Sequence, residues 1–69
     1  MTYIAEIETR IAGIPCIIAV TEYDDEDSSI SLDYVVCDRR GRPAPWLARK
    51  LTAKTAANVD QVVINHYNQ

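Results

Sequence analysis

The feature that most constrains the fold is the segment CDRRGRPAPWLARK at residues 37–50, which separates a strand-like half of the chain from a helical half. A residue that precedes proline is pushed out of the α region of backbone space, so Pro43 and Pro45 favour extended backbone here. Pro45 also suits the first turn of a helix. We therefore expect the chain to change from sheet to helix within this segment.

A chain of 69 residues is predicted to form a single domain spanning residues 1–69. Such a domain buries only about 60% of the surface of its unfolded chain, so its core is thin. The apolar content of 48% and the charged content of 25% are typical of a folded globular protein. Because phenylalanine is absent, we expect Trp46 to be a core anchor.

Three stretches in the first half have the pattern of strands. Residues 3–11 and 30–37 alternate apolar and polar side chains, the period-two pattern of a strand with one wet face. Residues 16–23 are rich in β-branched side chains and apolar on both faces, as in a central strand. The breakers in residues 12–15 predict a turn and hence a hairpin between the first two strands.

Both faces of the predicted central strand are apolar, but a single helix can cover only one face of the sheet. Cys16, Ile18 and Val20 would form one face, and Ile17 and Ala19 would belong to the other. An apolar row that faces water is a sticky patch, and a second subunit is its commonest cover. This pattern predicts a homodimer.

The run from Asp24 to Ser29 contains four carboxylates and no apolar side chain, which predicts a solvated loop between two strands. A calcium site is the alternative, but the run lacks the glycine and the distal glutamate of the familiar calcium-binding loop. An acidic docking surface is a second alternative.

After the prolines, residues 46–51 are predicted to form a short helix whose Trp46 and Leu47 seal the open end of the sheet. The main helix would follow, with Thr52 or Thr55 as its N-cap. Its inner face at helical spacing would contain Ala56, Val59, Val63 and Tyr67. The predicted fold class is thus α+β, a three-stranded antiparallel β-meander (β-β-β-α) with a short helical turn and one C-terminal helix packed on one face.

The two cysteines, Cys16 and Cys37, and the one histidine, His66, form no recognisable metal-ligand set. Without a secretory signal or a membrane-spanning run, the cysteines indicate reduced thiols in the cytoplasm, with a Cys16–Cys37 disulfide as the alternative. The two glycines of the chain cannot build a phosphate-binding loop, so no cofactor is expected.

No group of residues has the pattern of a catalytic site, so we expect a protein that is not an enzyme. Glu6 and Glu8 share one strand face, but two exposed carboxylates on the wet side of a strand explain them better than a catalytic pair does.

Charge is divided unevenly along the chain. Residues 1–38 have nine acidic side chains and one basic one, a net of −8, whereas residues 39–69 have six basic and one acidic, a net of +5; the sum is the overall −3. Two solvated faces of opposite charge are the simplest consequence, and a charged partner or head-to-tail self-contact is another.

The basic half supplies the candidate partner-binding residues, which are Arg39, Arg40, Arg42, Trp46, Arg49 and Lys50. Arginine and tryptophan are enriched at protein interfaces, which favours binding to a second copy of the chain or to a larger partner protein. The alternative is nucleic acid, with the cations of residues 39–54 on phosphates and Trp46 stacked on a base. The overall acidity argues against this alternative.

Two segments of the chain resemble small phage- and prophage-encoded proteins of uncharacterised function. They are IAGIPCIIAV at residues 11–20 and VCDRRGRPAPWL at residues 36–47, about half of the chain. In those proteins an acidic residue often follows the Trp-Leu pair, whereas Ala48-Arg49 follow it in this chain. This difference bears on whether the partner is shared and not on whether the fold is shared. The resemblance implies an accessory phage role in a bacterial cytoplasm and supplies no catalytic residue.

Overall fold

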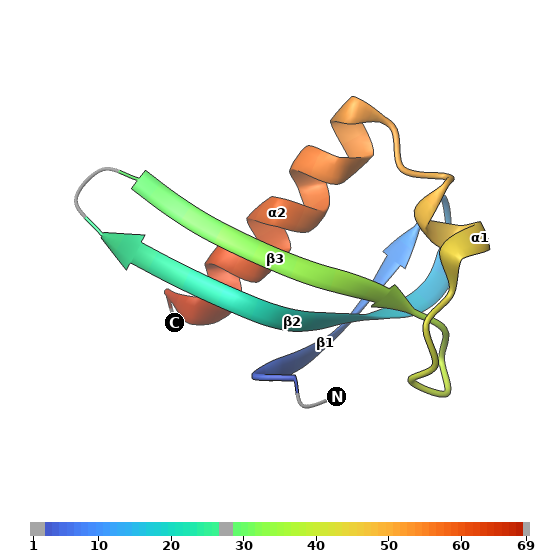
Figure 1. Cartoon of the computed structure of the whole chain (residues 1–69). Helices are drawn as coiled ribbons and strands as arrows, with labels where there is room; N and C mark the ends of the chain where they lie inside the picture. The colour runs from blue at the N-terminus through green and yellow to red at the C-terminus, as the bar shows by residue number, and fades with distance from the viewer. Residues whose placement is uncertain (1–2, 27–28, 69) are drawn as a thin grey trace.

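Three strands pair in chain order into an antiparallel sheet, and one long helix crosses one face of it (Figure 1). The computed structural model describes residues 3–26 and 29–68. The elements are β1 (Ala5–Ile11), β2 (Ile14–Glu26), β3 (Ser29–Cys37), α1 (Pro45–Ala48) and α2 (Ala53–Tyr67). The predicted α+β meander with a C-terminal helix is confirmed.

A two-residue turn joins β1 to β2. Its residues, Ala12 and Gly13, both have positive φ angles, 52° and 79°, the signature of a type I′ turn. Pro15, which we expected in the turn, instead lies in β2 opposite Arg10. Proline is tolerated there because a non-hydrogen-bonded pair directs its nitrogen away from β1, and β3 pairs with β2 only from Ile17 onward.

Ala12 is the only non-glycine residue with a positive φ in the described part of the chain. A left-handed conformation costs an alanine about 1–2 kcal/mol, partly offset by the extra freedom that glycine has when unfolded. Ala12→Gly should therefore raise the free energy of unfolding in urea by about 0.5–1 kcal/mol. The control is Ala57→Gly on the exposed side of α2, which should lower it by about 1 kcal/mol. Equal losses in both variants would contradict this turn geometry.

The acidic run forms strand rather than loop. Asp24, Asp25 and Glu26 end β2, and each pairs with a residue of β3, so the expectation of a loop over these residues is wrong. The backbone hydrogen bonds between two strands do not require apolar side chains. The side chains of Asp24, Asp25 and Glu26 are all exposed to solvent within the strand. Residues 27 and 28 of the expected loop lie outside the described residues. The second hairpin is therefore a two-stranded ribbon that continues past the last β1 partner, Val20.

A β-bulge at Thr21 changes which side chains of β2 face the helix. Val20 pairs with Tyr34, but Glu22 pairs with the next residue, Asp33, so Thr21 is the extra residue. Without the bulge, strict alternation would place Glu22 on the helix side. With it, Tyr23 faces α2 and its ring stacks on Tyr67, with centroids 4.1 Å apart.

The core lies between the sheet and the two helices. Its fully buried side chains include Ile11, Ile18, Val20, Leu47 and Val63. The helix α2 begins at the expected cap, because the Thr52 hydroxyl accepts a hydrogen bond from the Thr55 amide at 3.2 Å.

Trp46 is not a core residue, and this prediction was wrong. Its side chain is 51% exposed, whereas Ala44 and Leu47 are 1% and 0% exposed. The short helix α1 ends at Ala48 rather than at Leu51. The Ala44 amide donates to the Val36 carbonyl at 2.9 Å, which fixes the chain so that Leu47 faces the core. Successive helical residues differ by about 100°, so Trp46 then faces solvent.

The second face of the sheet is less open than its sequence suggests. Ala19 and Cys37 are fully buried on it, and Ile17 and Val35 are half-buried. Tyr3 is half-buried beside Cys37, whose thiol donates to the Val35 carbonyl at 3.8 Å. A single copy of the chain thus covers much of the surface for which we expected a second subunit.

Candidate functional site

The turn that follows β3 is held by one carboxylate. Asp38 Oδ1 accepts hydrogen bonds from the amides of Arg40 at 2.8 Å and Arg42 at 3.1 Å. The backbone closes the same turn, because the Asp38 amide donates to the Arg42 carbonyl and the Gly41 amide donates to the Asp38 carbonyl, at 2.8 and 3.0 Å. Gly41 has a φ of +83°, which only glycine adopts freely. Three arginines are therefore presented on an ordered turn.

These contacts lower the pKa of Asp38. The hydrogen bond from the Arg42 amide has the largest effect, the Arg40 amide adds to it, and the guanidinium of Arg42 contributes from 3.7 Å. A depressed pKa in the folded state means that the carboxylate orders the turn above the unfolded pKa of about 4. That contribution is lost as pH falls through the lower folded pKa.

We accordingly expect the amide proton resonances of Arg40 and Arg42 to move together during acid titration by NMR, with a midpoint below the usual aspartate range. The movement reports loss of the two hydrogen bonds as Asp38 is protonated. In the control variant Asp38→Asn, which keeps an acceptor oxygen but does not titrate, this step should vanish. A step that persisted in the asparagine variant would assign it to another carboxylate.

The turn, α1 and the first hairpin enclose a shallow cavity of about 370 Å³. Asp38 forms part of its wall. We name the other lining residues the Trp46–arginine surface: Ile14, Pro15, Arg39, Arg40, Arg42 and Trp46. An exposed indole and two apolar side chains here lie among three guanidinium groups.

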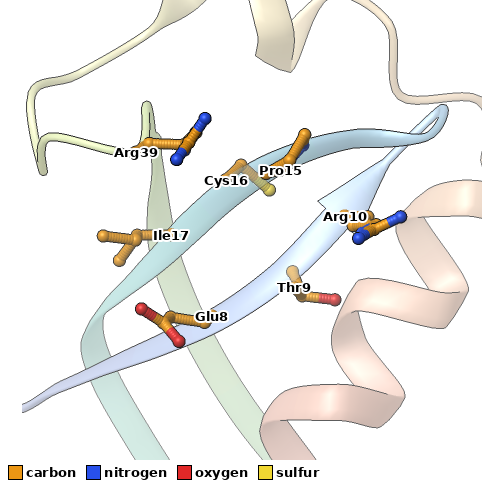
Figure 2. Close-up of a pocket in the computed structure, with 7 residues that line it drawn as sticks. All are labelled: Glu8, Thr9, Arg10, Pro15, Cys16, Ile17 and Arg39. Atoms are coloured by element: carbon orange, nitrogen blue, oxygen red, sulfur yellow. The ribbon is translucent and has the colours of Figure 1, made fainter.

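A second hollow of about 440 Å³ adjoins this surface and shares Pro15 and Arg39 with it. Figure 2 shows its lining from β1, from β2 and from Arg39 in the turn after β3, with Ile17 between the Glu8 carboxylate and the Arg39 guanidinium. Glu8 and Ile17 are direct cross-strand partners. The surface around Arg39 therefore carries both signs of charge.

The structure brings together only part of the predicted set. Arg39, Arg40, Arg42 and Trp46 line one cavity, whereas Arg49 and Lys50 are exposed beyond α1 and do not line it. Sequence reasoning missed Ile14 and Pro15, which come from the first hairpin. Little in the sequence indicates that these two residues belong to the site, because only the tertiary fold places the first hairpin beside the turn after β3.

The two cysteine thiols are held in the un-ionised form by their surroundings. Burial raises the pKa of the Cys16 and Cys37 thiols, and the nearby Tyr3 hydroxyl only partly opposes this at Cys37. Thiols with raised pKa values are poor nucleophiles. The strand register also directs the two side chains to opposite faces of the sheet, because Cys37 pairs with Ile17, and both cysteines are free.

Among residues 3–26 and 29–68, no three His, Cys, Asp or Glu side chains converge as metal ligands. His66 packs edge-on against Tyr67, with ring centroids 5.1 Å apart. No helix in the described part of the chain has the length and apolar character to span a membrane.

The residue types at the Trp46–arginine surface are those typical of surfaces that bind proteins. Tryptophan and arginine dominate the energetics of protein interfaces, where a central aromatic group is ringed by polar groups that exclude water. Cationic groups are complementary to acidic groups, and an ordered turn loses less entropy than a flexible one when it forms a contact.

Comparison with known proteins identifies phage relatives. The family model described as "YuA phage, Gp49" matches residues 24–63. A crystal structure described as an uncharacterized protein from Pseudomonas phage YuA is 39% identical, with a TM-score of 0.81 over 96% of this chain and 98% of that one. No curated protein matches the chain.

Proposed function

The chain belongs to the YuA phage Gp49 family, and from that membership we propose that it is a non-enzymatic phage accessory protein that binds another protein through the Trp46–arginine surface. The observation that carries the proposal is the exposure of Trp46, 51%, in α1 beside an ordered cationic turn. The partner is a second copy of the chain or a host or phage protein. The two free thiols support action in the reducing cytoplasm of the bacterial host.

Site-specific photo-crosslinking in host cells that express the gene tests this function. A photoreactive phenylalanine analogue replaces Trp46 in one variant and the exposed Gln61 of α2 in the control. We expect discrete protein adducts from position 46 and not from position 61. The proposal fails if the two positions give the same products, or if position 46 crosslinks to nucleic acid alone.

Nucleic-acid binding is the second candidate, and the same exposed indole among arginines favours it. Against it, Glu8 lies in the adjoining hollow, and the carboxylates of Glu6, Asp24 and Glu26 are exposed on the sheet. Trp46 is the only tryptophan, so its fluorescence reports on this surface alone. Titration with single-stranded DNA and with double-stranded RNA at low salt should leave the emission unchanged. A saturable change would favour this second candidate instead.

A further inference from the structure

The opposite end of the sheet carries a surface complementary to the Trp46–arginine surface. The ribbon formed by β2 and β3 exposes five carboxylates and one apolar side chain, which together we name the acidic ribbon: Glu22, Asp24, Asp25, Glu26, Asp33 and Ile30. Ile30 is 42% exposed and lies directly across from Asp25 on the α2 side of the ribbon, whereas the other four carboxylates lie together on the opposite side. Three large apolar side chains are notably exposed in the described residues, and Ile30 and Trp46 are two of them.

We propose that the acidic ribbon of one copy binds the Trp46–arginine surface of another, so that copies associate head to tail. This inference rests on the proposed function and assigns its partner. The carboxylates of the acidic ribbon are opposite in charge to the three guanidinium groups around the exposed indole, and such electrostatic complementarity steers association and fixes the orientation of the partners.

The two surfaces cannot satisfy each other within one molecule. Along β3, Asp38 lies five residues after Asp33 and eight residues after Ile30, which at about 3.3 Å per residue are rigid distances of about 17 Å and about 26 Å. The Arg42–Asp38 pair is the one ion pair formed among the described residues, and it lies within the cationic turn. The carboxylates of the acidic ribbon therefore have no cationic partner among residues 3–26 and 29–68 of their own chain.

The contact joins two different surfaces, so it is heterologous and leaves one free surface of each kind at the ends of every assembly. Such contacts build short open chains, or a ring if the rotation closes. The attraction depends mainly on exposed charges, which salt screens over a Debye length that falls from about 10 Å at 0.1 M to about 3 Å at 1 M. The association should therefore be weak at high salt.

A variant that lacks tryptophan, and so gives no tryptophan fluorescence of its own, tests the contact between two copies directly. The variant Trp46→Ser lacks the only tryptophan but keeps the acidic ribbon, so it can be titrated into dilute wild-type protein while Trp46 emission is followed. We expect a saturable change in emission and protection of Trp46 from acrylamide. The apparent affinity should drop about tenfold or more between low and high salt. The control titrant adds Asp24→Asn, Asp25→Asn and Glu26→Gln, and it should produce no change.

Sedimentation velocity of mixtures distinguishes this contact from a symmetric dimer. Arg39→Ser with Arg40→Ser disables one surface, and the three ribbon substitutions disable the other. Each variant alone should be monomeric, and their mixture should form a one-to-one complex that grows no further. A wild-type protein that stays monomeric at low salt overturns the inference, as does a mixture that does not associate. Adducts between position 46 and a different protein would then still support the proposed function.

Discussion

Replacing Leu47 with alanine is expected to lower the free energy of unfolding by about 2–5 kcal/mol, the range for a buried leucine that leaves a cavity. Its side chain is fully buried where α1 meets the end of the sheet. For a domain of this size, with a total stability of about 3–10 kcal/mol, such a loss is large. Urea denaturation followed by circular dichroism measures it.

The neighbouring substitution Trp46→Ala provides the matched control. It removes a larger side chain, but one that is half exposed, so the free energy of unfolding should change by less than about 1 kcal/mol. If Trp46→Ala were the more damaging of the two, the indole would belong to the core, and the Trp46–arginine surface would not exist as described.

Val63→Asp should unfold the domain at room temperature. Val63 is fully buried at the centre of the face that α2 presents to the sheet, and no cationic side chain is buried among the described residues to pair with a carboxylate there. An unpaired buried charge costs several kcal/mol, comparable with the whole stability of so small a domain. Circular dichroism should show loss of both helix and sheet signal.

The same change on the exposed side of α2 isolates burial as the cause. Gln61→Asp places a carboxylate in solvent two positions earlier in the helix. It should lower the free energy of unfolding only slightly, because aspartate has a lower helix propensity and the hydrogen bond from Gln61 to Asn65 is lost. A folded Val63→Asp protein of near wild-type stability would mean that α2 does not pack on the sheet as described.

Periodicity predicted most of the fold because burial imposes it directly. Alternation in β1 and β3 identified strands with one inner face, and the spacing of Val59 and Val63 identified the inner face of α2. Side-chain chemistry located the cap at Thr52, since a threonine ahead of a helical pattern supplies the missing acceptor.

Local patterns could not predict features that depend on long-range pairing. The bulge at Thr21 follows from how β2 meets β3, and it moves Tyr23 to the side where Tyr67 lies. Leu47 and Trp46 are adjacent, and composition favoured the larger residue for the core. The hydrogen bond between Ala44 and Val36 decided in favour of Leu47 instead.

The candidate site was predictable only in its charged part. The arginines and Trp46 are close in sequence, so their proximity follows from chain connectivity, with Asp38 fixing the turn between them. Ile14 and Pro15 reach the same cavity from a hairpin more than twenty residues earlier, and only the folded sheet reveals this.

The central claim is that Trp46 is an exposed recognition residue, and acrylamide quenching of its fluorescence tests this most directly. The signal has one source, because the chain contains one tryptophan. In dilute native protein we expect quenching nearly as efficient as in the urea-unfolded chain, with little change in the emission maximum on unfolding. A native signal that is strongly blue-shifted and several-fold protected from acrylamide would contradict the claim.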